Sequence, residues 1–398
     1  MQISDFGHLT YCTNIHPGEN WQTTFDSLQA FVPKIKQAVS TDAKLGLGLR
    51  LSHVASKELG LTNELQNFKK WLDDNGLYVF TMNGFPYGNF HNERVKDDVH
   101  APDWTTAERL VYTKQLFQQL EQLLPEGMYG GISTSPVSYM FWNKTLKAKK
   151  HALQLGSFNM FKIALQLSQI EERSGVYLHL DIEPEPDGLL ENSDEVLHFF
   201  DTYLVPMAKV QFKEQHIATQ REEEIVKRYL TVCYDVCHFA LAFEEPEVTF
   251  NKFKEKGIRV GKIQISAALK ILSANTNQDG LWKALEQFNE PTYLHQVTEL
   301  KNGVVVTYPD LPIVLEKKNS FKEMRAHFHV PIFLEKFTDL YSTQDQILKV
   351  LDYLKLERVT NHWEIETYTW DVLPKPLKLE LSASIIREIN WLKNALVS

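Results

Sequence analysis

Carboxylate side chains follow an apolar run in the middle of the chain. Residues 178–188 read LHLDIEPEPDG, so Asp181, Glu183 and Glu185 alternate and would share one side of an extended chain. The two prolines favour that extended conformation. A solvated acidic loop would also fit this composition. We favour a ligand site, because an unpaired carboxylate directly after an apolar strand, as at Glu183, is costly in free energy.

A second acidic position comes one apolar run later. Residues 233–238 read CYDVCH, in which Asp235 ends the run and His238 follows three residues on. This spacing can present two ligands where a strand turns into a helix. It suits equally well an Asp that caps the helix beside a packed His, so this segment alone does not decide between the two interpretations.

Further candidates stand near the ends of two later apolar runs. Gln264 offers a neutral amide oxygen within KIQIS (262–266). In HWEIET (362–367), Glu364 and Glu366 share a face, and Glu366 lies nearer the end of the run. Each of these signals is weak when taken alone.

Two histidines alternate in the segment HFHVP (327–331), which precedes the last of these runs. His327 and His329 would share a side if the chain is extended there. Paired histidines in a loop are more often structural than ligands, unless other ligands converge on the same place. Their assignment therefore depends on where the other polar residues lie.

The argument for a metal site is convergence. Glu183, Asp235, Gln264 and Glu366 fall at the ends of four successive predicted strands. Three carboxylates so close together could not all stay ionised without a cation, because like charges raise one another's pKa. An oxygen-rich set of this kind suits Mg²⁺ or Mn²⁺. Nearby histidines such as His327 and His329 would shift the preference toward Zn²⁺ or hold a second ion.

Polar residues at or just past the ends of the first three predicted strands are candidates for substrate binding. They are His16, Arg50, Asn83 and His91, to which we add Glu185. Arg50 could pair with a phosphate group. For each of them a salt bridge or a supporting hydrogen bond is an equally good interpretation.

The order of the predicted strands and helices indicates the fold that positions these side chains. Eight strand–helix units predict a single α/β domain over residues 1–398, folded as a (β/α)₈ barrel, rather than an open doubly wound sheet. No G-x-G-x-x-G follows the first strand, which removes the usual dinucleotide site of such a sheet. The predicted strands are Leu9–Asn14, Leu45–Leu51, Tyr78–Met82, Gly130–Ser135, Val176–Ile182, Tyr229–Tyr234, Ile258–Ile265 and His362–Thr367.

One segment interrupts this alternation. Residues 294–310 contain two β-rich runs around Lys301-Asn302-Gly303, and Asn-Gly favours a hairpin turn. We expect a β-hairpin insertion after the seventh strand, on the face where barrel loops build active sites. It could be a lid, an interaction surface or an excursion without a role.

Composition limits the classes of partner. The chain has 398 residues, with 42 Lys and Arg against 51 Asp and Glu, a net charge of −9 that argues against nucleic-acid binding. Its three cysteines, Cys12, Cys233 and Cys237, are too few for a disulfide framework and suit a reducing compartment. The first residues lack the pattern of a signal peptide, and no window is apolar enough to span a membrane. We expect a cytoplasmic protein without membrane insertion.

The candidate site resembles that of the xylose-isomerase-like superfamily of metal-dependent barrels. That superfamily has Glu at the fifth strand, Asp-x-x-His at the sixth, His or Gln at the seventh and Glu at the eighth. Glu183, Asp235, His238, Gln264 and Glu366 match this pattern in order. Its apurinic endonucleases carry Asp-x-His where this chain has HFH at 327–329, and that departure weakens an endonuclease interpretation.

Longer segments resemble the EboE family of metabolite traffic proteins over nearly the whole chain. They are YCTNIHPGENW (11–21), FPYGNFH (85–91), LHLDIEPEPDGLLENS (178–193) and CYDVCHFALAFEEP (233–246). This resemblance implies a role in secondary-metabolite production or export, with protein partners from the same operon. The family name carries no defined reaction.

The function predicted from these residues is a metal-dependent isomerase or epimerase acting on a sugar, a cyclitol or a sugar phosphate. The resemblance implies that Glu183 and Glu366 move the proton on either face of the substrate, while His238 binds a substrate oxygen. One alternative is a non-catalytic metabolite carrier or scaffold, although such a protein has no need of three buried acids. Another is a zinc phosphodiesterase that uses His327 and His329. Metal content would separate these three functions.

Overall fold

Eight parallel strands close into a barrel. The computed structural model describes residues 1–61, 63–88, 95–214, 221–273, 278–370 and 372–397. Within them, the main sheet has the order β1-β2-β15-β8-β7-β6-β5-β4-β3, and a parallel bridge between Cys12 and Gly48 joins β2 to β3. The predicted (β/α)₈ barrel is confirmed. Its strands are β2 (Gly7–Tyr11), β3 (Leu45–Arg50), β4 (Leu77–Asn83), β5 (Gly130–Thr134), β6 (Leu178–Ile182), β7 (Leu230–Asp235), β8 (Val260–Ile265) and β15 (His362–Ile365).

The first strand ends earlier than its sequence predicts. The structure ends β2 at Tyr11, and Thr13–Ile15 form a short 3₁₀ helix, η2, in which Asn14 is buried. The two-residue strand β1 (Gln2–Ile3) pairs antiparallel with β2 at the edge of the sheet. The chain therefore turns at the barrel mouth while its polar residues are still within reach of β15.

Helices surround the barrel, and several of them combine an apolar stripe with a capped start. In α1, Trp21, Leu28 and Val32 are buried at helical spacing, and Asn20 caps the first turn. In α5, Thr145 caps the start. The helices are α1 (Trp21–Val39), α2 (His53–Leu59), α3 (Glu64–Asp74), α4 (Ala107–Leu123), α5 (Leu146–Ser174), α6 (Ser193–Phe199), α7 (Val205–Glu214), α8 (Glu222–Tyr229), α9 (Val236–Leu241), α10 (Pro246–Glu255), α13 (Gln344–Leu356) and α14 (Leu381–Val397).

The insertion after β8 is larger than the predicted hairpin. The hairpin itself is confirmed as β10 (Val297–Lys301) and β11 (Val304–Tyr308), but it belongs to a six-stranded antiparallel sheet of order β11-β10-β12-β9-β14-β13. The other strands have only two to four residues, too few for an alternation that can be recognised in the sequence. Its remaining elements are β9 (Leu269–Leu272), α11 (Gln278–Glu286), α12 (Leu311–Lys317), β12 (Glu323–Ala326), β13 (Lys336–Phe337) and β14 (Leu340–Ser342).

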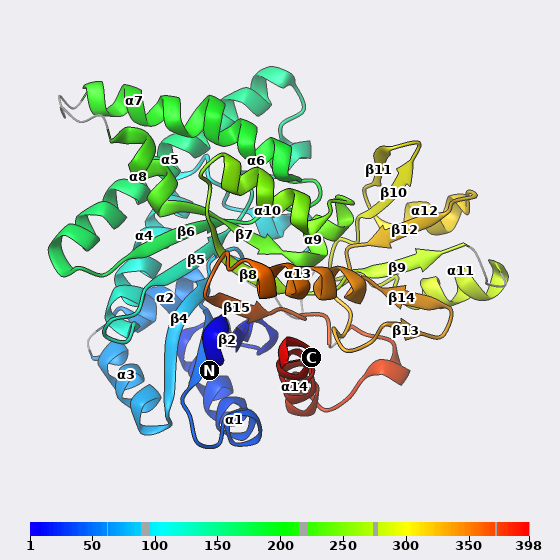
Figure 1. Ribbon diagram of the computed structural model, residues 1–398, viewed down its shortest axis with the longest axis horizontal. Helices are drawn as coiled ribbons and strands as arrows, with labels where there is room; N and C mark the ends of the chain where they lie inside the picture. The colour runs from blue at the N-terminus through cyan, green and yellow to red at the C-terminus, as the bar shows by residue number, and fades with distance from the viewer. Residues whose placement is uncertain (62, 89–94, 215–220, 274–277, 371, 398) are drawn as a thin grey trace.

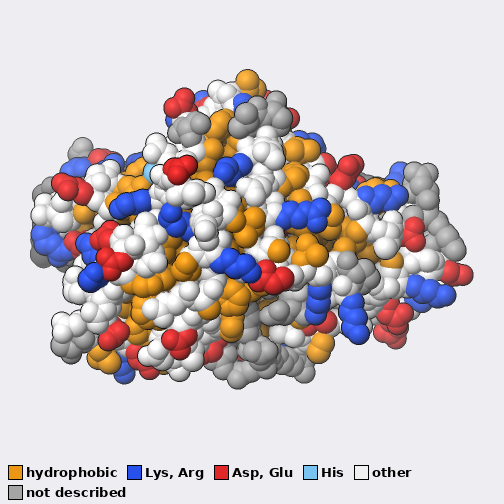
Figure 2. All heavy atoms as spheres, turned by 90° about the horizontal axis from the view of Figure 1, so that it is seen from below, with side chains coloured by type: hydrophobic (Ala, Val, Ile, Leu, Met, Phe, Trp, Pro, Cys, Tyr) orange, Lys and Arg blue, Asp and Glu red, His pale blue; other side chains and the backbone are white. Residues whose placement is uncertain are grey.

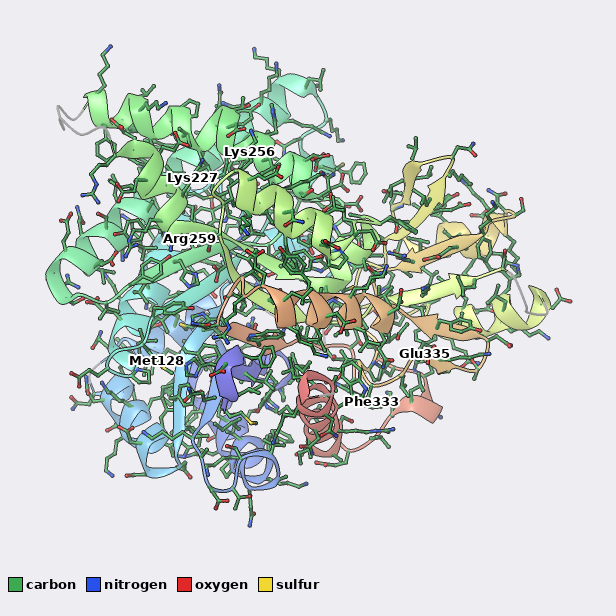
Figure 3. The ribbon with its side chains drawn as sticks, in the orientation of Figure 1. Met128, Lys227, Lys256, Arg259, Phe333 and Glu335 are labelled. Carbon is green, nitrogen blue, oxygen red and sulfur yellow. The ribbon has the colours of Figure 1, made fainter. Side chains whose placement is uncertain are left out.

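The insertion lies at the carboxyl ends of the barrel strands. In Figure 1 it extends to the right of the barrel, and its strands are yellow to orange. Figure 3 shows both ends of the molecule: Met128 and Arg259 stand just before β5 and β8, whereas Phe333 and Glu335 belong to the insertion. The insertion is thus next to the end where barrel enzymes place their active sites.

Three glycines on the barrel strands leave room for two buried carboxylates. A Cβ atom on Gly48 would collide with Glu364 Oε2. A Cβ atom on Gly131 or Gly261 would collide with the carboxylate of Asp181. The inside of the barrel is therefore shaped around charged groups at this level.

Both carboxylates have partners inside the barrel. Lys262 Nζ lies 2.8 Å from Glu364 Oε1 and 3.0 Å from Ser133 Oγ, and the lysine and glutamate side chains are fully buried. Asp181 Oδ1 lies 2.6 Å from His179 Nδ1. Asp181 thus faces the barrel interior, deeper than Glu183. We call Lys262, Glu364, Asp181 and His179 the ionic layer; branched aliphatic side chains are more usual at such positions.

The outer surface mixes charged and apolar side chains. Figure 2 shows the face seen from below, where hydrophobic side chains are interspersed with lysines, arginines and acids. Among the described residues, no helix combines the length and the apolarity that crossing a bilayer would require.

Candidate functional site

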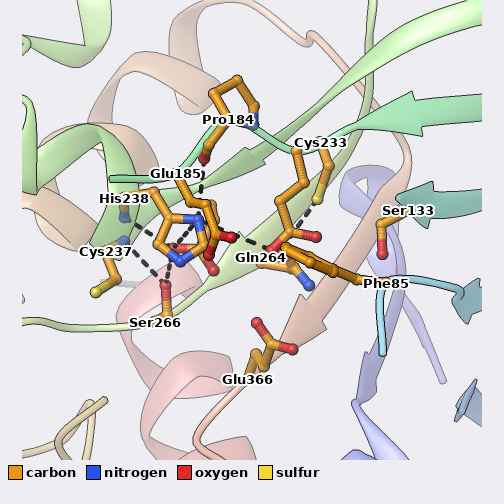
Figure 4. A network of polar contacts seen from close by, with 12 residues as sticks. Phe85, Ser133, Pro184, Glu185, Cys233, Cys237, His238, Gln264, Ser266 and Glu366 are labelled. Carbon is orange, nitrogen blue, oxygen red and sulfur yellow. Dashed lines mark hydrogen bonds and ion pairs between the residues drawn. The ribbon is translucent and has the colours of Figure 1, made fainter. Parts of the chain in front are cut away.

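The strand ends bring three carboxylates together. Glu183 follows β6, Asp235 is the last residue of β7, and Glu366 follows β15. Each offers an oxygen, these oxygens lie within 4.8 Å of one another, and all three residues are buried. Figure 4 shows that Glu366 and Glu185 approach the same space from different segments. The sequence placed these acids on separate strands, and the barrel brings them to one point.

This cluster leaves acceptors without partners. Among the described residues, Glu183 Oε2 and Asp235 Oδ2 are buried and accept no hydrogen bond. Burial raises the pKa of both Glu183 and Glu366 well above the usual range, and neighbouring carboxylates, Asp235 among them, raise these pKa values further. Burying unpaired acceptors is costly, so a bound cation would stabilise the cluster.

The structure fixes two of the three acids through their other oxygens. Asp235 Oδ1 accepts from the His238 backbone N–H at 2.9 Å and from Ser266 Oγ at 2.8 Å, so it caps α9. Glu366 Oε1 accepts from Asn14 Nδ2 at 2.8 Å and from Asn83 Nδ2 at 2.9 Å. Asp235 is thus both a helix cap and a member of the cluster, so the two interpretations of its segment are compatible.

Gln264 is in register with the cluster, but its amide nitrogen rather than its amide oxygen is directed toward the carboxylates. It pairs with Asp235 on β7, its Oε1 accepts from Cys233 Sγ at 3.0 Å, and its buried Nε2 has no partner. A 180° rotation of the amide would turn Oε1 toward the carboxylates and leave Nε2 to donate to the Cys233 sulfur. Gln264 fits a metal ligand only in that second orientation.

Three buried histidines direct their Nε2 atoms into the same space. Their Nδ1 atoms lie 2.8–3.0 Å from oxygen acceptors: His238 from Pro184 O, His327 from Gln296 Oε1, and His329 from Glu366 O. Because these partners are acceptors, each Nδ1 donates, and each Nε2 has a lone pair available for a ligand. A metal-binding histidine is commonly held in this way.

These histidines form ligand-sized groups with the acids. Nitrogens of His238 and His329 lie within 4.8 Å of an Asp235 oxygen and of each other. His238 Nε2 is 3.1 Å from His327 Nε2, and among the described residues His329 Nε2 has no partner. Burial lowers the pKa of His329 to about 4, so this ring is neutral and able to bind a metal at neutral pH. The condition that other ligands converge on His327 and His329 is therefore met.

Cys237 is a core residue close to the histidines. It is fully buried beside Leu241 and Ala268. Its Sγ also lies within 4.8 Å of ring nitrogens of His327 and His329. The sequence could have indicated this only through its position next to His238.

The predicted substrate residues divide into two groups. Glu185 and Asn83 line the cavity above the acids, and Glu185 Oε1 lies 3.0 Å from His100 Nε2. Arg50 instead donates to the carbonyls of Gly18 and Gly88, so it supports loops.

His16 also serves as support, since it stacks on Phe31 and lies 2.9 Å from the Tyr11 hydroxyl. Neither His16 nor Arg50 is among the lining residues. Both sit at the outer end of their strands, where they pack against neighbouring segments. The fifth candidate, His91, lies outside the described residues.

The cavity has a polar floor and an apolar wall. It spans roughly 620 Å³ of non-atom space, including its open mouth, with Glu183, Glu366, His238 and His327 among the lining residues. The wall is formed by Phe85, Pro86, Val95, Val99, Tyr293, Leu294 and Tyr368.

Sequence analysis missed several functional candidates at this cavity. They are Asn14, which donates to Glu366, together with His100, Tyr293 and Gln296, which line the cavity. Tyr293 and Gln296 come from the insertion, whose contact with the barrel has no signal in one sequence. Asn14 was assigned to a strand, although its closeness to that strand's end was a usable signal.

Comparisons with known proteins give a fold likeness at low identity. No protein-family model matches the chain, and no curated protein matches it either. Solved structures that are similar include the IolI protein with a bound zinc atom, at 11% identity, TM-score 0.49 and 98% coverage of both chains. Another is the probable 3-DHS dehydratase AsbF from Bacillus anthracis, at 10% identity, TM-score 0.47 and coverage of 97% of this chain and 99% of that one.

A third similar structure is a xylose isomerase-like TIM barrel protein from Mycobacterium smegmatis in complex with magnesium. It has 10% identity, a TM-score of 0.44 and coverage of 92% of this chain and 89% of that one. Of these three, the Mycobacterium smegmatis protein is described as a TIM barrel. The resemblance to the EboE family was not matched and stays a prediction from the sequence.

Proposed function

We propose that this chain is a metal-dependent enzyme of the isomerase or epimerase type, acting on a small hydroxy-carbonyl compound such as a sugar, a cyclitol or its phosphate. The observation that carries the proposal is the set of unpartnered buried atoms on Glu183 and Asp235 beside Glu366. The hydrogen bonds of Asp235 and Glu366 account for one oxygen of each, and they leave Glu183 Oε2 and Asp235 Oδ2 without a partner among the described residues.

The residues present fit a divalent cation. Glu183, Asp235 and Glu366 would hold it through oxygen, joined by Gln264 after rotation of its amide. A hard ion such as Mg²⁺ or Mn²⁺ suits these oxygens, and the neighbouring imidazoles make Zn²⁺ compatible as well. When bound, the ion would polarise a carbonyl or hydroxyl oxygen of the substrate.

The chain's own residues supply the proton chemistry. Glu183 has one buried oxygen with no partner, so that oxygen is available to take a proton from a carbon next to the carbonyl. Glu366, which accepts hydrogen bonds from Asn14 and Asn83, would return the proton. His238 donates through Nδ1 to Pro184, which leaves Nε2 to accept a hydrogen bond from a substrate hydroxyl.

The wall of the cavity supports this chemistry by excluding water. Phe85, Tyr293 and Tyr368 line the same cavity as Glu183 and Glu366. A dry site strengthens the electrostatic interactions at the acids and protects a reactive carbanion-like species from solvent. Exchange of the moved proton with solvent deuterium would distinguish proton transfer from a shielded hydride shift.

A second candidate function is hydrolysis of a phosphate ester by more than one zinc ion. It is favoured by His238, His327 and His329, whose Nε2 atoms all face the space beside the carboxylates. Two-metal sites commonly activate water for such reactions. The replacement of Asp by His327 relative to the endonuclease pattern makes this the weaker candidate.

Metal analysis of the purified protein tests these proposals together. One bound ion, with turnover of a keto-sugar or cyclitol and none of a phosphodiester, is the result we expect. Two or three zinc ions with phosphodiester cleavage would replace the isomerase proposal by the hydrolase. Absence of any bound metal after reconstitution with Mn²⁺, Mg²⁺ and Zn²⁺ would favour a carrier or scaffold.

A further inference from the structure

The loop between β5 and α5 is held firmly at the carboxyl end of the barrel. Residues 140–150, which comprise the end of this loop and the first residues of α5, read MFWNKTLKAKK and include the 3₁₀ helix η4 (Met140–Trp142). The Met140 N–H donates to Asp187 O at 2.8 Å, and Tyr139 forms a bridge with Gly188. The loop is thus anchored to the segment that carries Glu183 and Glu185.

Three large apolar side chains of this loop project into solvent. Leu146 is 80% exposed, Phe141 46% and Trp142 40%. Exposing three such groups within six residues loses hydrophobic stabilisation, so the arrangement indicates a surface that becomes covered in use.

Lysines surround these apolar groups. Lys144, Lys147 and Lys150 are exposed, and none of them forms an ion pair among the described residues. The first turn of α5 contains no acidic residue, although the helix dipole favours negative side chains there. Positive side chains at a helix N-terminus are disfavoured by the helix dipole, and an anionic partner would offset that cost.

The loop also adjoins the rim of the cavity. Trp142 Nε1 donates to Asp97 at 3.0 Å, and the Trp142 ring lies edge-on to His100 with centroids 6.3 Å apart. His100 lines the cavity and contacts Glu185. If a surface covers this loop, a substrate that leaves that surface would therefore be next to the mouth of the cavity.

We propose that Phe141, Trp142, Lys144, Leu146, Lys147 and Lys150 form a docking patch for a lipid bilayer that carries anionic lipids. Aromatic and aliphatic side chains enter the interface between headgroups and acyl chains, while lysines pair with anionic headgroups. Such peripheral contact needs no spanning helix.

A second exposed apolar group lacks this charge match. Leu300, Val304 and Val305 project from the β10–β11 hairpin, but Val305 lies in a groove whose lining includes Glu191, Asp194 and Glu244. Acids there would repel an anionic bilayer. The docking patch gathers three exposed apolar side chains and three lysines without an ion pair among the described residues.

Vesicle flotation of the full chain tests the proposal. We expect binding to vesicles that contain phosphatidylglycerol, weak binding to phosphatidylcholine alone, and release at high salt. In Lys144→Glu/Lys147→Glu, the partition coefficient should fall on the order of fivefold or more for each lysine removed. Phe141→Ser/Leu146→Ser should lower binding to both kinds of vesicle.

A matched control carries the same chemical changes elsewhere. Lys209→Glu/Val210→Ser alters an exposed lysine and an exposed valine on α7, and it should bind vesicles like the parent chain. Unchanged circular dichroism and metal content would show that each variant folds. No binding of the parent chain to anionic vesicles would overturn the proposal, as would equal loss in the α7 control. Binding of the patch only to an acidic protein would overturn it too.

Discussion

At the scale of single residues, the candidate site is a set of atoms that lack partners. Glu183 Oε2, Asp235 Oδ2 and His329 Nε2 are buried around one space and form no hydrogen bond within the described chain. Each such atom carries a desolvation cost that a ligand would remove. Metal binding and stability are therefore coupled at these residues.

Glu183→Gln tests the coupling between metal binding and stability, both without metal and with metal. Without metal, the variant should be more stable than the parent, because it removes one charge from a cluster that repels itself. With metal, the order should reverse, since the parent gains about 2.7 kcal/mol at a metal concentration 100-fold above its Kd. Thermal melts with and without metal would measure both effects. Glu191→Gln, a half-buried acid outside the cluster, should show neither, and equal metal content in parent and Glu183→Gln would refute the assignment.

At the scale of elements, the insertion contributes directly to the site. Gln296, immediately before β10, accepts from His327 Nδ1 at 2.9 Å and donates to Pro186 O at 3.2 Å. It thereby fixes which nitrogen of His327 faces the acids. The hairpin was predictable from Asn-Gly, but this hydrogen bond was not.

Gln296→Ala should weaken metal binding at the histidines on the order of 10- to 100-fold, as loss of such a supporting hydrogen bond commonly does. The remaining carboxylate site should keep its affinity, because its oxygens are held by Asn14, Asn83 and Ser266. Zinc titration monitored by calorimetry would separate binding at the histidines, which the hydrolase candidate requires, from binding at the carboxylates. Thr298→Ala, two residues further along the chain in β10, serves as control. An identical loss of affinity in that variant would contradict the role of Gln296.

The helix α14 is hydrogen-bonded to two loops that carry candidate site residues. Glu388 Oε1 accepts from the Ile332 N–H at 3.2 Å and from Thr367 Oγ1 at 2.8 Å, so it joins α14 to the loops that carry His329 and Glu366. Burial raises the pKa of this carboxyl to about 8. Glu388 is thus protonated in the folded chain at neutral pH.

A raised acid pKa makes the folded state bind more protons than the unfolded state, so stability falls as pH rises from 4.5 toward 8. Glu388→Gln keeps both hydrogen bonds and removes the titration, so it should flatten this part of the pH–stability curve by on the order of 5 kcal/mol. Urea unfolding at several pH values would measure the slope. A slope unchanged in the variant would assign the pH dependence to other groups.

The elements also show what one sequence can and cannot predict. Runs of five to eight residues rich in β-forming side chains gave all eight barrel strands, because burial on both faces leaves a hydrophobic signal. The short strands β9, β12, β13 and β14 gave none. Asn14 donates to Glu366 across 352 positions, and nothing in local sequence links two residues so far apart. His16 and Arg50 have the right residue types, and only packing shows that they support loops.

At the scale of the whole molecule, the barrel depends on the ionic layer. Lys262→Met or Glu364→Leu alone should destabilise the fold by about 3–5 kcal/mol, because each leaves an unpaired buried charge. The double variant should lose much less. Denaturation of the four proteins forms a double-mutant cycle. The exposed pair Lys349–Glu245, at 2.7 Å, gives the comparison, and its removal should cost about 0–1 kcal/mol.

The way the barrel closes determines where its backbone should open most easily. A single parallel bridge, from Cys12 to Gly48, joins β2 to β3, whereas β5 and β6 share five paired positions. Backbone amides along this seam should exchange with heavy water before those of β6, because fewer ladder bonds hold them. Gly48 lies against Glu364. Opening of the β2–β3 pairing would therefore also admit water to the buried salt bridge beneath the cavity.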